Sequence, residues 1–197
     1  MHVIDQRGRS WLTKHIVSPI GKVLVRLRIT ASMVTMLGLV VAVAGAIVLA
    51  NGHPFTGAFL IGLGGGIDGV DGTVARLTGT VSRRGAFLDT MSDRVGEVAM
   101  FAGVAWFVAD DPLLVLLAII SLGNSMLIPY ARAKAEAEGL DGKGGIMGRA
   151  ERIILFCLLL MPVGWDWWGA EVMLWPMATL TAITVGQRFW KAWVGLG

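Results

Sequence analysis

The chain has 197 residues, of which 55% are hydrophobic and only 16% are charged, with a formal net charge of +3. This composition is too apolar for an ordinary soluble domain and is typical of a polytopic membrane protein. The length allows one domain, so we expect residues 1–197 to form a single membrane domain. Within it, residues 1–28 form a juxtamembrane segment and residues 32–190 the transmembrane core. The single cysteine, Cys157, excludes an internal disulfide.

The segment at 9–27 is amphipathic and basic. Apolar residues recur there at helical spacing, with Lys14, Lys22 and Arg26 among them, and Trp11 stands near its start. This pattern predicts a helix that lies in the membrane surface. Two roles are open for it: it either positions a functional site, or it is a simple basic anchor.

Six mainly apolar stretches with helical character follow, and most are separated by turns that contain glycine, asparagine or proline. We expect an all-α integral membrane protein with six transmembrane helices, plus the N-terminal interfacial amphipathic helix. The six helices are predicted at residues 29–50, 55–78, 85–107, 113–138, 149–161 and 172–190.

The basic residues predict the topology of these spans. All 17 Lys and Arg residues lie in the first thirty residues and at 76–94, 132–152 and 188–191. The turns at 51–54, 109–112 and 162–171 contain none. With six spans, the basic segments all lie on one side, which the positive-inside rule identifies as cytoplasmic. We therefore expect a multi-pass protein of the cell membrane whose site faces the cytoplasm.

Four aspartates in the second and third predicted helices are spaced so that they can meet. Asp68 and Asp71 are three residues apart, and Asp89 and Asp93 are four apart, so each pair shares a helix face. Two such helices side by side would bring four carboxylates together, which is tolerable if divalent cations lie among them. Hard oxygen ligands suit Mg²⁺, Mn²⁺ or Ca²⁺. Structural pairing accounts for one intramembrane acid more readily than for four.

Small residues share the helix face of Asp68. A face made of carboxylates and small residues leaves a cleft beside the acids, and glycines also allow close helix packing. A diphosphate fits such a cleft, because metals can clamp phosphoryl groups and an arginine can bind their oxygens. The neighbours of Asp68 on this face are Gly64, Asp71, Gly72, Ala75 and Gly79, with Arg76 at its edge.

The pattern Asp68-x2-Asp71-Gly72-x2-Ala75-Arg76-x8-Gly85-x3-Asp89-x3-Asp93 resembles the complete signature of the CDP-alcohol phosphotransferase family. Members are integral membrane enzymes that transfer a phosphatidyl or related group from a CDP-linked donor to an alcohol and release CMP. The resemblance implies two Mg²⁺ ions, with Mn²⁺ as a possible substitute. It implies that Asp68, Asp71, Asp89 and Asp93 are the metal ligands, and that Asp93 is also the general base.

The same resemblance implies a binding site for CDP-diacylglycerol. Many members carry a T-P-N-x-x-T-like motif at the start of the first span, where this chain has Ser32 and Thr35, with Ala31 in place of the proline. Ser82, in the short basic loop between the second and third helices, is expected to bind a donor phosphate. The implied donor-binding residues are Ser32, Thr35, Gly72, Ala75, Arg76, Ser82 and Gly85.

Basic residues at three helix ends lie on the same predicted side as the aspartates. Arg132, Arg152 and Arg188 each stand at the inner end of a span, where their side chains could converge. Such a cluster suits a phosphate on the acceptor, although basic residues at this level are also common as topology signals or lipid contacts.

A narrower resemblance concerns the acceptor. Residues 133–140, the pair Gly144-Gly145 and residues 149–152 resemble actinobacterial phosphatidylinositol phosphate synthases, which carry K-A-R-A-E-A-x-G-L and E-R-P-E-R segments. By this resemblance, the acceptor is inositol phosphate, and its phosphate is bound by Arg132, Arg152 and Arg188.

Two alternatives stay open. One is a phosphatidylglycerophosphate synthase, or another CDP-alcohol phosphotransferase with a different acceptor. The other is a divalent-cation transporter, since intramembrane acids also mark ion paths. The family resemblance further implies a homodimer among membrane lipids and no nucleic-acid partner.

Overall fold

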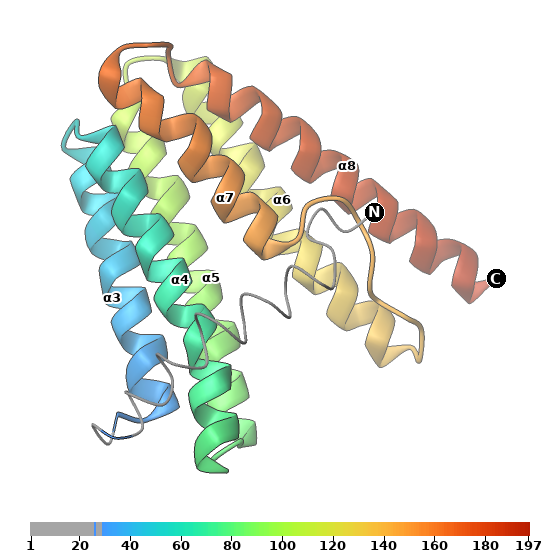
Figure 1. Cartoon of the computed structure of the whole chain (residues 1–197). Helices are drawn as coiled ribbons and strands as arrows, with labels where there is room; N and C mark the ends of the chain where they lie inside the picture. Colours follow the sequence, from blue (N-terminus) through green and yellow to red (C-terminus); the bar gives the residue numbers. More distant parts are fainter. Residues whose placement is uncertain (1–25, 27–28) are drawn as a thin grey trace.

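The structure is a computed structural model that describes residue 26 and residues 29–197 (Figure 1). The predicted interfacial helix at 9–27 therefore lies outside the described residues, apart from Arg26. The side chains of Arg76 and Leu77 also lie outside the described part. Throughout the described residues the regular structure is helical, which confirms an all-α fold.

The described chain forms the six helices that the sequence predicts. Five of them begin and end within two residues of the predicted bounds, and the last continues to Leu196, beyond its predicted end at residue 190. The elements are α3 (Ala31–Ala50), α4 (Pro54–Thr78), α5 (Arg83–Phe107), α6 (Pro112–Ala137), α7 (Arg149–Leu160), the short 3-10 helix η2 (Met161–Trp165) and α8 (Glu171–Leu196).

Capping residues explain where several helices begin and end. The side chains of Thr30 and Ser82 each accept a hydrogen bond from the backbone N–H three residues further on, at 3.3 Å and 3.1 Å, and so begin α3 and α5. Asp111 caps α6 in the same manner, through two backbone N–H groups of its first turn. Gly79, with a φ of +66°, ends α4 in the left-handed conformation that glycine adopts without strain.

Helices α3 and α4 pack at backbone contact because glycines of both helices face each other. A Cβ atom added to Gly64 would lie 2.6 Å from the carbonyl oxygen of Gly38, and one added to Gly57 would lie 2.9 Å from that of Gly45. Such small-residue contacts are typical of helices packed in membranes. Gly64 therefore allows close packing of α3 against α4, which is one of the roles that the sequence leaves open for the glycines near Asp68.

The helices diverge from one end of the molecule to the other. In Figure 1, α3, α4 and α5 run side by side, whereas α6 and α8 lie away from them at the end that holds Leu196. At the opposite end, near η2, large apolar side chains from α5, α7 and α8 form the buried core, among them Phe101, Phe156, Met173 and Met177. The polar residues predicted to form the site lie on the divergent side of this core.

Two described helices, α3 and α6, are long and apolar enough to cross a membrane by length and composition. Large apolar side chains also lie exposed on the outside of the described structure, including Val40, Ile47, Trp106, Ile119 and Leu158. Extensive apolar surface of this kind marks contact with lipid or with another protein.

Candidate active site

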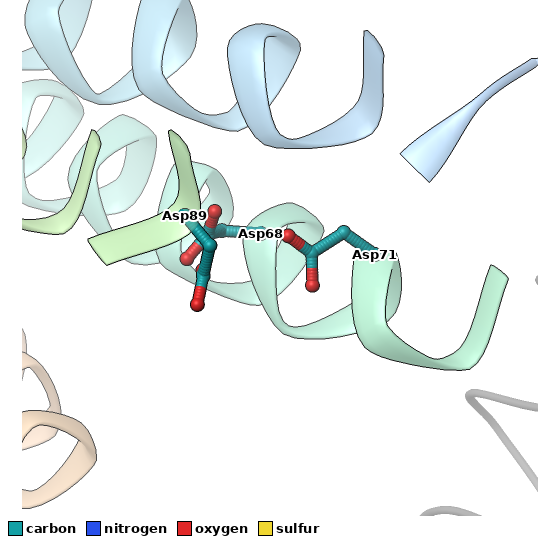
Figure 2. A group of neighbouring side chains, drawn as sticks. All are labelled: Asp68, Asp71 and Asp89. Atoms are coloured by element: carbon teal, nitrogen blue, oxygen red, sulfur yellow. The ribbon is translucent and has the colours of Figure 1, made fainter. Parts of the chain in front are cut away.

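Three of the four predicted aspartates form one group (Figure 2). Asp68 and Asp71 come from α4 and Asp89 from α5, and one carboxylate oxygen of each lies within 4.8 Å of the other two. Figure 2 shows the three side chains next to one another, with those of Asp68 and Asp71 on the same helix. Asp68 is buried and the other two are half-buried. Since three close carboxylates repel one another and offer only hard oxygen ligands, the group fits a divalent cation such as Mg²⁺ or Mn²⁺.

Thr35 connects α3 to this group. Its buried hydroxyl lies 2.5 Å from Oδ2 of Asp71 and donates a hydrogen bond to it. The same hydroxyl also lies 3.1 Å from the carbonyl oxygen of Ala31. A hydrogen bond to a carboxylate restricts its rotation, so Thr35 orients Asp71 as an outer-shell residue orients a metal ligand.

Asp93 stands beside the three-carboxylate group and pairs with arginines. Its Oδ1 lies 2.8 Å from Nη2 of Arg149, and its Oδ2 lies 3.6 Å from Nη2 of Arg94. Arg149, at the start of α7, also donates from Nη1 to Oδ2 of Asp68 at 3.0 Å. The guanidinium of Arg149 therefore bridges Asp68 and Asp93. The roles of Asp93 as metal ligand and base stay predictions.

A pocket of about 630 Å³ opens between α3, α4 and α5 on one side of the aspartates. Asp71 and Asp89 line it. The side chain of Arg76, also predicted to bind the donor, lies outside the described part. The other residues of the predicted donor site all line this one pocket: Ser32, Thr35, Gly72, Ala75, Ser82 and Gly85.

A second pocket, of about 780 Å³, opens between α4, the loop at 138–148, α7 and α8. Glycines of α4 form one wall and leave space next to the basic side chains. Two of the three residues predicted to bind an acceptor phosphate lie here, Arg132 and Arg188. Lys143 and Arg149 also line this pocket, so four cationic side chains from different elements surround it. We call it the basic pocket.

Arg152 lies behind the basic pocket. Its side chain is only 1% exposed, and its Nε donates to Oε1 of Glu97 at 3.0 Å. Its Nη2 contacts the same oxygen, and its Nη1 donates to the carbonyl oxygen of Met147 at 3.2 Å. Each nitrogen of this guanidinium thus has a protein partner, which places Arg152 away from the pocket that Arg132 and Arg188 line.

Two residues of this region, Glu97 and Arg149, are absent from the site predicted from sequence. A signal for Glu97 was available, because it follows Asp93 by four residues and continues the spacing of Asp89 and Asp93 on one face of an apolar helix. No local pattern shows the contact of Arg149 with Asp68, because the two residues are 81 positions apart.

The chain belongs to the CDP-alcohol phosphatidyltransferase family, whose sequence model matches residues 28–186. It is thus an enzyme that transfers a phosphatidyl group and uses a CDP-linked donor. This finding favours the enzyme over the alternative of a divalent-cation transporter.

Individual proteins similar to this chain belong to a narrower class of enzyme than the whole family. The chain is 38% identical over 195 residues to the phosphatidylinositol phosphate synthase of Mycobacterium marinum, covering 92% of this chain and 81% of that protein. It is 37% identical over 194 residues to the phosphatidylinositol phosphate synthase of Mycobacterium tuberculosis, covering 92% and 88%.

Crystal structures of the Mycobacterium tuberculosis phosphatidylinositol phosphate synthase share the fold. The complex with manganese and citrate has a TM-score of 0.83 at 35% sequence identity, covering 90% of this chain and 89% of that one. The structure with CDP-DAG bound has a TM-score of 0.82 at the same identity, covering 90% and 94%.

Proposed function

We propose that the chain transfers the phosphatidyl group of CDP-diacylglycerol to a hydroxyl of inositol phosphate, with phosphatidylinositol phosphate and CMP as products. The observation that carries this proposal is that the aspartates are connected to two different pockets: Asp71 and Asp89 line one, and Arg149, which lines the other, binds Asp68 and Asp93. One pocket is lined by the residues predicted to bind the donor, and the other is lined by four cationic side chains. The relatives named phosphatidylinositol phosphate synthase support the same donor and acceptor.

Asp68, Asp71 and Asp89 are proposed to hold a divalent cation, Mg²⁺ or Mn²⁺, and Asp93 is proposed to help hold a second ion. Their grouped oxygens fit this role, and the Mycobacterium tuberculosis relative was solved with manganese. A cation bound there stabilises negative charge that develops on phosphate oxygens during transfer.

The donor pocket is proposed to receive the CDP moiety. Gly72 and Ala75 line it with almost no side chain, so a diphosphate can come close to the helix beside Asp71. Ser82 lies at the first turn of α5, where backbone N–H groups and the positive end of the helix dipole favour an anion. Together these residues bind and orient the diphosphate next to the acids.

The basic pocket is proposed to receive the acceptor phosphate. Arginine suits this role because its planar guanidinium can donate two parallel hydrogen bonds to phosphate oxygens. Arg132, Arg149 and Arg188 would hold the phosphate, and Arg152 supports them from behind. Asp93 would take the proton of the attacking hydroxyl, which has to reach its carboxylate within hydrogen-bond distance.

We propose that the whole chain, residues 1–197, is one multi-pass domain with six spans. In this topology, segment 1–28 lies at the membrane surface and the pockets face the cytoplasm, because every basic segment then lies on one side. A homodimer in the membrane is proposed from the family resemblance.

An acceptor assay tests the function. The purified enzyme in lipid vesicles receives CDP-diacylglycerol, Mg²⁺ or Mn²⁺, and either inositol phosphate, glycerol phosphate or unphosphorylated inositol. We expect CMP release and a new phospholipid with inositol phosphate, and none after chelation of the metal. Transfer to glycerol phosphate alone would establish the phosphatidylglycerophosphate synthase alternative, and transfer to inositol itself would contradict a phosphate-binding role of the basic pocket.

A pair of variants assigns the acceptor to the basic pocket. Arg132 lines this pocket, whereas Lys134, two residues further along α6, pairs with Glu138 at the surface and does not line it. Arg132→Gln should raise the KM for inositol phosphate about tenfold, a loss typical of one charge-assisted hydrogen bond. Lys134→Gln removes the same charge and should leave this KM unchanged. Equal effects of the two variants would contradict the assignment.

A further inference from the structure

Behind the basic pocket, Glu97 of α5 is buried between two arginines. Its side chain is 2% exposed. Its Oε1 accepts hydrogen bonds from Nε and Nη2 of Arg152, and its Oε2 accepts one of 2.5 Å from Nη1 of Arg94. A buried carboxylate is tolerated only when it is paired and hydrogen-bonded, and here both oxygens are used.

Through Arg152, Glu97 reaches the loop that forms one wall of the basic pocket. The carbonyl oxygen of Met147 accepts a hydrogen bond from Arg152, and its N–H donates to Oγ1 of Thr184 at 3.1 Å. Met147 is thus fixed on both sides, by α7 and by α8. The same loop contributes Lys143 to the pocket lining. The shape of this wall therefore depends on where Arg152 is held.

Through Arg94, Glu97 reaches the aspartates. Nη1 of Arg94 binds Glu97 and lies 3.5 Å from the carbonyl oxygen of Ser125 in α6. Nη2 of the same guanidinium lies 3.6 Å from Oδ2 of Asp93. Because Glu97 and α6 hold one nitrogen of Arg94, the other is kept next to Asp93.

We propose that Glu97 is a positioning residue for both halves of the reaction. Glu97 touches the ligand of neither pocket. It fixes Arg152 and, through Arg152, the loop that lines the basic pocket. It also keeps Arg94 beside Asp93. The inference rests on the proposed function and deepens it, because it assigns Arg152 to the support of the basic pocket. The charge of Glu97 is essential, since a neutral group cannot balance the buried guanidinium of Arg152 and the half-buried one of Arg94.

Glu97→Gln tests this role, because it keeps the shape of the side chain and removes its charge. We expect the KM for inositol phosphate to rise about tenfold or more and kcat to fall, while the KM for CDP-diacylglycerol stays within about twofold. Trypsin should also cleave faster after Lys143 in the detergent-solubilised variant, because the loop is held less firmly. Glu138→Gln is the matched control: it removes an exposed carboxylate paired with Lys134, and both readouts should stay at the wild-type level.

Two results with Glu97→Gln would overturn the inference. Unchanged kinetics and unchanged cleavage after Lys143 would show that the charge of Glu97 positions nothing. Equal increases of both KM values with a lowered thermal midpoint would indicate general destabilisation. If the variant does not fold, Arg152→Lys takes its place: it keeps the positive charge but cannot hold both Glu97 and the Met147 carbonyl, so it has to show the same difference between the two KM values.

The double variant separates support from direct binding. If Arg152 acts through Glu97, then adding Arg152→Lys to Glu97→Gln raises the KM for inositol phosphate no further than Glu97→Gln alone does. If Arg152 binds the acceptor itself, the two losses multiply and the inference fails. The cleavage assay needs no substrate, so it tests the role of Glu97 even if inositol phosphate proves not to be the acceptor.

Discussion

The hydroxyl of Thr35 and the carboxylate of Asp71 are joined by a hydrogen bond of 2.5 Å between α3 and α4. The threonine is buried, and its partner belongs to the three-carboxylate group. The contact places an outer-shell hydrogen bond on a proposed metal ligand. Through Thr35, α3 therefore takes part in the site, although its motif has Ala31 where many family members have a proline.

Removal of this hydroxyl should weaken metal binding. Thr35→Val is expected to lower Mn²⁺ affinity and kcat/KM each by about ten- to a hundredfold, since hydrogen bonds to charged groups contribute about 1.5–3 kcal/mol. Electron paramagnetic resonance of bound Mn²⁺ measures the affinity without turnover. Thr35→Ser keeps the hydroxyl and should stay close to the wild type, and an equal loss in both variants would contradict the hydrogen-bond explanation.

Asp93→Asn should abolish turnover and leave CDP-diacylglycerol binding largely intact. The reason is that an amide cannot accept the proton of the attacking hydroxyl, while the group of Asp68, Asp71 and Asp89 is unchanged. Titration calorimetry with the donor and a CMP-release assay measure the two effects. Asp68→Asn is the comparison, and a loss of donor binding of the same size in both variants would argue against a base at Asp93.

Substitutions of Ser82 distinguish a helix cap from a phosphate contact. Its side chain accepts a hydrogen bond from the N–H of Gly85 and also lines the donor pocket. Ser82→Ala should cost about 1 kcal/mol of stability as a lost cap. Ser82→Asp keeps a cap but adds a negative charge, so it should raise the KM for CDP-diacylglycerol about tenfold or more at normal thermal stability. An unchanged KM in Ser82→Asp would leave Ser82 as a cap alone.

A methyl group at Gly64 should destabilise the protein. The Cβ atom of Gly64→Ala would lie 2.6 Å from the carbonyl oxygen of Gly38, so α3 and α4 would have to move apart, at a cost of about 1–3 kcal/mol. Gly66→Ala is the control, because nothing lies within 4 Å of the added atom there. Thermal unfolding in detergent should show a lower midpoint for the first variant and an equal or higher one for the second.

The helices were predictable because their ends are encoded locally. Thr30, Ser82 and Asp111 cap helices, Gly79 ends one, and each signal acts within four residues of its own position. The six donor-site residues that line one pocket were implied by the family resemblance. Helical periodicity accounts only for residues on the same helix, such as Gly72 and Ala75 on α4. Prediction therefore succeeded where the information lies within one or two turns of a helix.

The partners of the charged residues were not predictable in this way. The spacing of Asp89 and Asp93 places both on one face, but a face does not determine which neighbouring helix supplies a counter-charge. Arg149 reaches Asp93 from α7, and Arg152 turns from the basic pocket toward Glu97. Both contacts depend on how α7 packs against α4 and α5, which no periodicity within a single helix specifies.

The backbone contact between α3 and α4 has a mechanical consequence. Gly38 contacts Gly64 and Gly45 contacts Gly57, so at these points no side chain lies between the two helix backbones. Side chains there would be able to change rotamer and let the helices move. Sliding or rotating one helix against the other would bring backbone atoms into collision, so the pair acts as a stiff wall. Any widening of the molecule beside this pair therefore has to come from movement of the other helices.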